Sequence, residues 1–224
     1  MDMFGSSIGK KFYEDGKIRR YPGNTVVADV TPGCRAYDVM THLRQMVIDA
    51  GFDNELILLP EDSYHMTVFR GLNDQVRTDS HWPARLSKET PMEAVDDYIS
   101  AAVASAVVPG PARMRFDKVS WSNNCCIICL VPADDAQKET LLAFRDRAAD
   151  AVGLKLPGHD EYVFHISLGY TRIIVEGKRE EERLALIEKM NRYIATQPVF
   201  ETGVPYMAYY DDMLKFSPVR IPRG

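Results

Sequence analysis

The stretches Tyr64-His65-Met66-Thr67-Val68 and Phe164-His165-Ile166-Ser167-Leu168 decide the fold of this chain. Each reads apolar or aromatic, His, apolar, hydroxyl, apolar, which is the alternation of a β-strand with one polar face. Because successive side chains of a strand point to opposite sides, each His shares a face with the hydroxyl two positions later. The sequence therefore predicts two strands that each present one imidazole and one hydroxyl, backed by core residues.

The two stretches are part of a longer similarity at a constant offset. His65 and His165 are 100 positions apart, and the same offset aligns residues 24–32 with residues 124–132. Both ranges begin with Asn, contain β-branched residues and end at Pro, which predicts strands. Each is followed by a helical pattern and then by its His strand, which indicates an internal duplication. We expect one two-lobed domain over residues 1–224, with repeats at about 24–70 and 124–170.

The remaining periodicities predict an α+β fold: a bilobal, pseudo-twofold arrangement of mostly antiparallel sheets, with helices packed outside and a central cleft. Apolar residues recur at helical spacing in four ranges and at strand spacing between them. The C-terminal tract 199–221 reads as two strands that turn at Asp211-Asp212. The expected helices cover about 36–50, 90–106, 134–153 and 178–195.

Composition limits the classes of function. The chain has 224 residues, of which 46% are hydrophobic and 26% charged, as in ordinary soluble globular proteins. Its formal charge of -5 argues against a surface that follows a long nucleic acid, while a short or terminal piece stays possible. No apolar run reaches the length of a membrane span, and the N-terminus has no signal core. We expect a cytoplasmic monomer without a membrane partner.

The N-terminal segment has two interpretations. Residues 12–18 have a hairpin pattern with Asp15-Gly16 at the turn. The segment is basic, which suits a solvated edge protected by lysines against aggregation. The alternative is that it guides a phosphate toward the cleft. The basic residues are Lys10, Lys11, Lys17, Arg19 and Arg20.

Two further features invite a functional and a structural interpretation. Cys126 and Cys129 form a C-x-x-C pattern inside an expected strand, where positions three apart face opposite sides, so buried thiols are favoured over a redox or zinc site. Residues 71–112 have no counterpart in the second repeat. Trp82 in this segment either belongs to a lid over the substrate or pins the loop to the body.

Two facing imidazoles suit acid-base chemistry at phosphorus. Imidazole has an ordinary pKa near neutrality, so one ring can accept a proton while the other donates one. An in-line displacement at phosphorus needs a base on the attacking water and an acid on the leaving oxygen. The two hydroxyls can donate hydrogen bonds to the phosphoryl oxygens, where negative charge sits. This chemistry requires no metal and no cofactor, and it predicts a bell-shaped dependence of rate on pH.

The paired motifs His65-Met66-Thr67-Val68 and His165-Ile166-Ser167-Leu168 resemble the two-histidine (2H) phosphoesterase superfamily. That superfamily includes LigT-like RNA 2′,3′-cyclic phosphodiesterases, and this chain is similar to a little-characterised, largely bacterial branch of it. The resemblance implies metal-free hydrolysis of a cyclic phosphate, on a 2′,3′-cyclic nucleotide, an RNA end or an ADP-ribose cyclic phosphate. It also implies that one of His65 and His165 acts as the base and the other as the acid, in an order that the sequence leaves open. Thr67 and Ser167 would hold the phosphate.

Four more residues are candidates for substrate binding. Phe69 has the strand parity to face the cleft, whereas Arg70 has the wrong parity unless a bulge intervenes. Asn24 and Asn124 begin the first strand of each repeat and either bind substrate or cap a turn. Arg172 follows a stretch where the strand bends, so its direction stays open.

Two other functions remain compatible with the sequence. One is a binding module that uses the same groove for nucleotides or RNA ends without turnover. The other is a metal-dependent hydrolase built on the same His pair, although the two strands offer no third ligand and lack the carboxylate of common metal triads.

Overall fold

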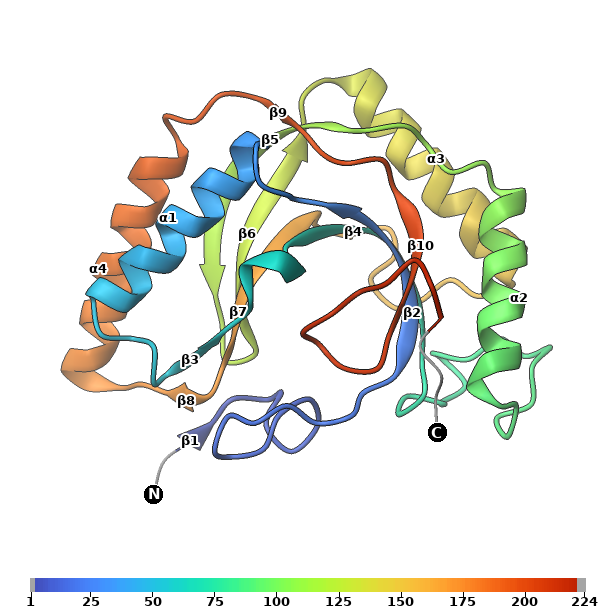
Figure 1. The fold of residues 1–224 in the computed structure, drawn as a ribbon, viewed down its shortest axis with the longest axis horizontal. Coiled ribbons are helices and arrows are strands. Elements are labelled where there is room, and N and C mark those ends of the chain that lie inside the picture. Colours follow the sequence, from blue (N-terminus) through green and yellow to red (C-terminus); the bar gives the residue numbers. More distant parts are fainter. Residues whose placement is uncertain (1–2, 221–224) are drawn as a thin grey trace.

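A computed structural model describes residues 3–220 as an α+β fold built on antiparallel strands, which confirms the expected fold class. The main sheet of the described residues has the strand order β10-β2-β4-β7-β6-β5-β9, and β3 also pairs with β7. The sheet curves around a concave face, with the helices on its outer side (Figure 1). The strands of this sheet are β2 (Gly23–Asp29), β3 (Leu56–Leu58), β4 (His65–Asn73), β5 (Arg113–Trp121), β6 (Cys125–Pro132), β7 (His165–Thr171), β9 (Phe200–Glu201) and β10 (Tyr206–Tyr210). A small second sheet pairs β1 (Met3–Phe4) with β8 (Ile173–Ile174).

The helices form two pairs on the outer side of the sheet (Figure 1). The helix α1 follows β2 but packs against α4, which covers β5, and α3 follows β6 but packs against α2, which contacts β2, β4 and β10. Each lobe therefore carries two helices, and the helix of each repeat lies beside strands of the other half. The helices are α1 (Arg35–Asp49), α2 (Met92–Ser105), α3 (Asp135–Val152) and α4 (Gly177–Ile194). Within residues 3–220, the helices lack the combined length and apolar character that a membrane-crossing segment needs.

The two His strands pair with their neighbours in the same register at an offset of 100. On β2, Val27 lies opposite Thr67, and on β6, Ile127 lies opposite Ser167. Both pairings then shift by one residue at the same place, so Val68 and Leu168 are each left without a partner. An extra residue of this kind is a β-bulge, and it reverses which side the following residues face.

A buried pair joins the two halves of the sheet. Met66 of β4 lies opposite Ile166 of β7, and both side chains are fully buried. In antiparallel strands the neighbours of such a pair run in opposite directions and share the other face. The residues on either side of Met66 and Ile166 therefore come together on the concave face.

The ends of the elements differ from expectation in two places. The helix expected over about 90–106 begins only at Met92, because Pro91 occupies the N-cap position in an extended conformation. The tract after β10 is a loop, not a second strand: residues 211–217 return to the sheet only through the bridge between Tyr209 and Ser217. Met213 of this loop is buried and lines the cavity on the concave side.

The Cys126 and Cys129 thiols are free and buried in β6. Burial raises the pKa of both thiols, because the charged thiolate is poorly solvated there. Both features fit the structural interpretation of the C-x-x-C pattern.

Gly169 occupies a position where the backbone of β3 approaches β7. A Cβ atom at this residue would lie 2.5 Å from the Ile57 carbonyl oxygen and 2.9 Å from a side-chain carbon of Leu56. We expect Gly169→Ala to lower the free energy of unfolding by about 1–3 kcal/mol, the usual cost of overpacking. Urea denaturation measures this change. Gly110→Ala is the matched control, because a Cβ at Gly110 meets no atom within 4 Å. Equal stability of the two variants would contradict the close approach.

Candidate active site

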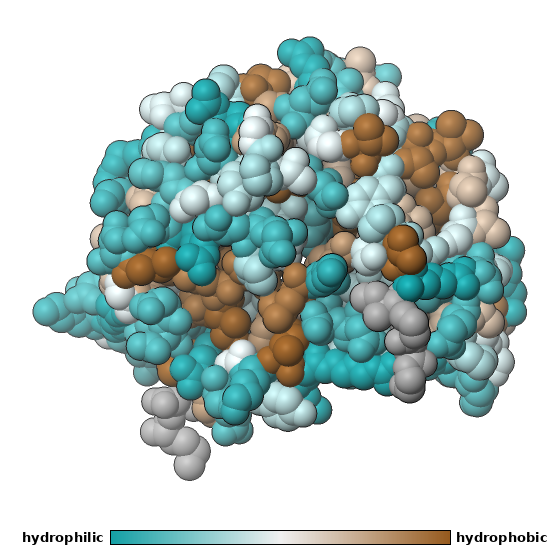
Figure 2. Space-filling model, viewed as in Figure 1, coloured by the Kyte–Doolittle hydropathy of each residue, from teal (hydrophilic) through white to brown (hydrophobic). Residues whose placement is uncertain are grey.

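The concave face of the sheet contains an open cavity of about 500 Å³, and His65, Thr67, His165 and Ser167 all line it. These four residues come from the central strands β4 and β7, so the structure brings together the groups that the sequence paired. Most of the surface on this side is hydrophilic, with apolar residues in patches, one of them near the middle (Figure 2). A volume of this size is typical of pockets that bind ligands of nucleotide size.

Both imidazoles are oriented in the same way. His65 Nδ1 lies 2.7 Å from the Ser63 carbonyl oxygen, and His165 Nδ1 lies 2.7 Å from the Val163 carbonyl oxygen. A carbonyl only accepts, so each Nδ1 carries the proton and donates it. Each Nε2 then makes no hydrogen bond to a described residue and is free to exchange a proton with a ligand.

The antiparallel register places the four groups at the corners of a quadrilateral. Because Met66 lies opposite Ile166, His65 is beside Ser167, and Thr67 is beside His165. The two imidazoles are therefore diagonal neighbours, which in a regular sheet are about 7–8 Å apart. This arrangement leaves room for a phosphoryl group between two proton carriers, with a hydroxyl on each side.

Burial lowers the pKa values of both imidazoles, and the charged groups that add to this effect differ between them. Burial lowers the pKa of His65 to about 4, and the neighbouring His165 adds to this shift. The Phe216 ring covers His65, with 4.1 Å between ring centroids. Burial also lowers the pKa of His165, with smaller contributions from the positive charges of Arg70 and Lys11. Both rings are therefore neutral at pH 7 in the free protein.

The bulge in β4 corrects the expected direction of two side chains. Phe69 does not face the cavity: it is 4% exposed and packs against Phe144 in the core. Arg70 lines the cavity instead, because the unpaired residue Val68 reverses the alternation of the strand. The carbonyl oxygen of Val68 accepts a hydrogen bond from the buried guanidinium of Arg145 at 2.9 Å, which holds the bulge in place.

The equivalent bulge in β7 turns Tyr170 toward the cavity, and Tyr170 positions a lysine from the N-terminal segment. The Lys11 ammonium donates to the Tyr170 hydroxyl at 3.1 Å and lies over the rings of Tyr170 and Tyr21. Lys11 lines the cavity, whereas Lys17 of the same segment is solvent-exposed. The phosphate-guiding interpretation of this segment therefore fits Lys11, and the solvated-edge interpretation fits Lys17.

The two asparagines have partners within the protein. Asn24 is 1% exposed; its side chain accepts from the backbone N–H of Leu72 and donates to Asp96, both at 2.9 Å. Asn124 accepts from the hydroxyl of Ser7 at 2.6 Å. Both side chains border the cavity, but these bonds favour the structural interpretation over substrate binding.

Arg172 lies outside the cavity lining. Its guanidinium donates to the backbone carbonyl of Glu14 at 2.8 Å and to that of Asn54 at 3.4 Å. The side chain therefore ties the N-terminal turn to the loop before β3, and the expectation that it binds substrate is not supported by its position.

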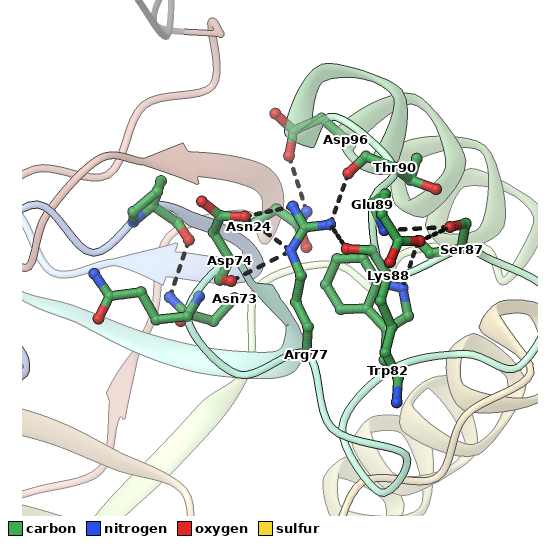
Figure 3. Close-up of polar contacts among 12 residues, drawn as sticks. Asn24, Asn73, Asp74, Arg77, Trp82, Ser87, Lys88, Glu89, Thr90 and Asp96 are labelled. Atoms are coloured by element: carbon green, nitrogen blue, oxygen red, sulfur yellow. Dashed lines mark hydrogen bonds and ion pairs between the residues drawn. The ribbon is translucent and has the colours of Figure 1, made fainter.

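Arg77 connects distant parts of the segment between β4 and α2 to one another (Figure 3). Arg77 binds Asp74 and donates to the carbonyl oxygens of Lys88 and Thr90 at 2.6 and 2.7 Å. Its guanidinium lies 4.4 Å from the ring of Trp82, which is buried. Trp82 belongs to the main hydrophobic core, which favours the pinning interpretation, while His81 of the same segment lines the cavity.

A separate group of possible metal ligands lies away from the His pair. Among residues 3–220, Asp146, His159 and Asp160 form the one cluster whose ligand atoms all lie within 4.8 Å of one another. Each already has a partner: His159 bonds Asp146 at 2.9 Å, and Asp160 pairs with Lys155 at 2.7 Å. His65 and His165 do not belong to this cluster.

Several cavity residues had no signal in the sequence. Phe216 and Met213 come from the loop after β10, which folds back across the concave side (Figure 1). Tyr162 precedes β7 and donates to the Thr67 carbonyl oxygen at 3.2 Å. None of these residues belongs to a repeat strand, and a single sequence does not show which distant segments meet in space.

Comparisons with known proteins concern the family and the fold of this chain. A family model described as 2H-phosphodiest, a domain of unknown function (DUF1868), matches residues 11–125. The crystal structure of the conserved protein of unknown function ATU0111 from Agrobacterium tumefaciens str. C58 is similar over 98% of this chain and 93% of that chain, with 26% identity and a TM-score of 0.86. A search of curated proteins found no match.

Two more distant structures are also similar. The crystal structure of TT0787 of Thermus thermophilus has 13% identity and a TM-score of 0.45, covering 84% of this chain and 85% of that chain. The apo form of E. coli LigT has 11% identity and a TM-score of 0.45, covering 90% of this chain and 96% of that chain.

The contact between Phe216 and His65 predicts a change in titration. We expect Phe216→Ala to raise the pKa of His65 from about 4 toward its ordinary value, because water then reaches the ring. The titration of the imidazole C–H signals by NMR measures this shift, and His165 in the same spectra is the control. An unchanged pKa of His65 would mean that Phe216 does not shield it.

Proposed function

Because the chain belongs to the 2H-phosphodiesterase family (DUF1868), we propose that it is a metal-independent phosphodiesterase that hydrolyses a cyclic phosphate by two-histidine acid-base catalysis. The observation that carries the proposal is the matched orientation of the two imidazoles. Each donates from Nδ1 to a backbone carbonyl and leaves Nε2 for the ligand, and the hydroxyls of Thr67 and Ser167 line the same cavity. The substrate class is a 2′,3′-cyclic nucleotide, an RNA end or an ADP-ribose cyclic phosphate.

The proposed reaction consumes one water. One neutral Nε2 accepts a proton from that water as its oxygen attacks phosphorus, and the other ring, protonated, donates a proton to the leaving ribose oxygen. The P–O bond of the cyclic ester breaks and a phosphomonoester remains. The Thr67 and Ser167 hydroxyls donate hydrogen bonds to the non-bridging oxygens, whose negative charge they stabilise during the displacement.

The charge of the cavity supports an anionic substrate. The chain has a formal charge of -5, yet no Asp or Glu is among the described residues that line the cavity, whereas Lys11 and Arg70 are. A cavity with positive and without negative side chains attracts a phosphate anion even in an acidic protein.

The two rings suit different roles. His65 has a pKa of about 4 and is covered by Phe216, so it stays neutral over nearly the whole working range and suits the base. His165 then acts as the acid. A bound phosphate anion favours its protonated form, because opposite charges attract at short distance.

A turnover screen tests the proposal. We expect the wild-type protein, with chelator present, to hydrolyse at least one of the 2′,3′-cyclic mononucleotides, a cyclic-phosphate-ended oligonucleotide or ADP-ribose 1″,2″-cyclic phosphate. His65→Ala and His165→Ala should each lower kcat by about 10²-fold or more, the usual worth of one acid-base group. His42→Ala is the matched control, because His42 is exposed on α1 and stacks on Tyr193.

Each outcome of the screen is informative. Activity of the wild-type protein that is present without chelator and absent with it would contradict the metal-free proposal and favour the metal-dependent hydrolase. Binding of these ligands by a folded wild-type protein without any product would favour a non-catalytic module for nucleotides or RNA ends.

The lowered pKa values predict the pH dependence of kcat/KM, which reports the free enzyme. The active form has His65 neutral, which requires a pH above about 4, and His165 protonated, which requires a pH below its lowered pKa. We therefore expect a bell-shaped profile with its optimum below about pH 6.5, the ordinary pKa of histidine. Thr67→Ala should lower the curve and keep its shape. A flat profile from pH 5 to about 8, or an optimum above about pH 7, would contradict the assignment.

A further inference from the structure

The cavity has two cationic side chains, Lys11 and Arg70, in addition to the imidazoles and the hydroxyls. Arg70 and Tyr170 occupy equivalent positions in the two repeats, because both follow the bulge and pair with Thr25 and Cys125 at the offset of 100. Tyr170 bears no charge, but its hydroxyl accepts from the Lys11 ammonium. The cavity therefore has a guanidinium on the β4 side and an ammonium on the β7 side. Burial lowers the pKa of Lys11, and the positive charge of Arg70 lowers it further, which indicates that the two groups lie near each other.

The Lys11 ammonium is held in place without a counter-ion. Its backbone N–H donates to the Ser7 carbonyl at 2.9 Å, its carbonyl accepts from the Arg19 N–H at 2.8 Å, and its ammonium lies 4.5 Å from the Tyr170 ring centroid. No carboxylate among residues 3–220 forms an ion pair with it or lies on the cavity wall. An ammonium that is partly desolvated and unpaired is unfavourable, and a bound anion removes that cost.

Arg70 has the same property. Its side chain lines the cavity, and within the described part of the chain it has no ion pair and no side-chain hydrogen bond. Cations nearby are treated differently: Lys17 pairs with Asp15 at 2.7 Å, and Arg20 pairs with Asp211 at 3.2 Å. These two cations of the N-terminal region thus have carboxylate partners, whereas Lys11 and Arg70 line a cavity without a carboxylate.

Arg70 is offset from the reacting groups along β4. A strand rises about 3.3 Å per residue, so the backbone at Arg70 lies roughly 7–10 Å beyond Thr67, allowing for the bulge. The hydroxyls of Thr67 and Ser167 and one protonated imidazole already suffice for a cyclic phosphodiester, which carries a single negative charge. Lys11 and Arg70 add positive charge in excess of what that anion needs. Burial lowers the pKa of Lys11, and a bound anion favours its charged form.

We propose that Lys11 and Arg70 form a second anion subsite, which binds a phosphate of the substrate other than the one that is hydrolysed. The inference rests on the proposed function for the identity of the first phosphate, and it narrows the substrate to a nucleotide that carries a cyclic phosphate and a further phosphate group.

Calorimetry with product-like nucleotides tests the subsite without requiring turnover. The probes are adenosine 2′,5′-bisphosphate and adenosine 2′-monophosphate, and the matching 3′,5′-bisphosphate and 3′-monophosphate, with chelator present. We expect the wild-type protein to bind a bisphosphate at least about tenfold more tightly than the corresponding monophosphate, because two charge-assisted contacts are added. Arg70→Gln and Lys11→Gln should each reduce this ratio, and the double variant should bring it to about one. Monophosphate affinity should change by less than about threefold.

The controls separate the subsite from general charge effects. Lys17→Gln removes a positive charge from the same segment outside the cavity, so it should keep the wild-type ratio. Arg70 is exposed, so Arg70→Gln remains informative even where Lys11→Gln fails to fold. Circular dichroism checks the fold of each variant.

Three results would overturn the inference. Equal affinity of the wild-type protein for bisphosphates and monophosphates would mean that no second subsite exists. Equal weakening of both ligands by Arg70→Gln would mean that the cations bind the hydrolysed phosphate itself. Absence of binding of any probe to the folded wild-type protein would remove the site altogether. A different result would contradict the proposed function and leave the subsite intact: tight binding of a bisphosphate together with no hydrolysis of any cyclic phosphate.

Discussion

The pairing of Met66 with Ile166 is the contact on which the rest of this structure depends. It joins β4 to β7, and so it makes one curved sheet from two repeats. Because the pair is buried, its neighbours on both strands must face the concave side. The same constraint that protects two apolar side chains from water therefore brings two imidazoles and two hydroxyls together. A slip of one residue in either strand would turn the imidazole and the hydroxyl of that strand into the core.

Much of this arrangement was readable from the sequence because it follows from alternation and repetition. The strand parity around His65 and His165, the constant offset between the repeats and the main helices depend on local periodicity, which a single sequence contains. The bulges at Val68 and Leu168 were not readable in the same way. A bulge needs a partner for its displaced backbone, and here the partners are distant: Arg145 for the Val68 carbonyl and the Leu59 N–H for the Leu168 carbonyl. For this reason the expected directions of Phe69 and Arg70 were reversed.

The residues that make the cavity asymmetric come from outside the repeated strands. Duplication alone supplies equivalent groups at His65 and His165, each with the same bond from Nδ1 to a backbone carbonyl. The N-terminal segment then adds Lys11 on one side, and the loop after β10 adds Phe216 on the other. A pair of identical imidazoles cannot act as base and acid until their surroundings differ. The two chain ends supply that difference. The basic pattern of the N-terminal segment left two interpretations open, and the C-terminal sequence did not indicate the contact of Phe216 with His65.

Net charge and site charge are separate quantities in this protein. The acidic surface carries carboxylates that pair with cations such as Arg20 and Lys17, while the described residues lining the cavity include none. The formal charge of -5 therefore limits association with long nucleic acids at the surface and does not weaken an anion site inside. Around the half-buried Lys11, water shields charges less than it does at the open surface. The net charge thus argues against binding of long nucleic acids at the surface, whereas Lys11 and Arg70, which have no carboxylate partner, favour binding of an anion in the cavity.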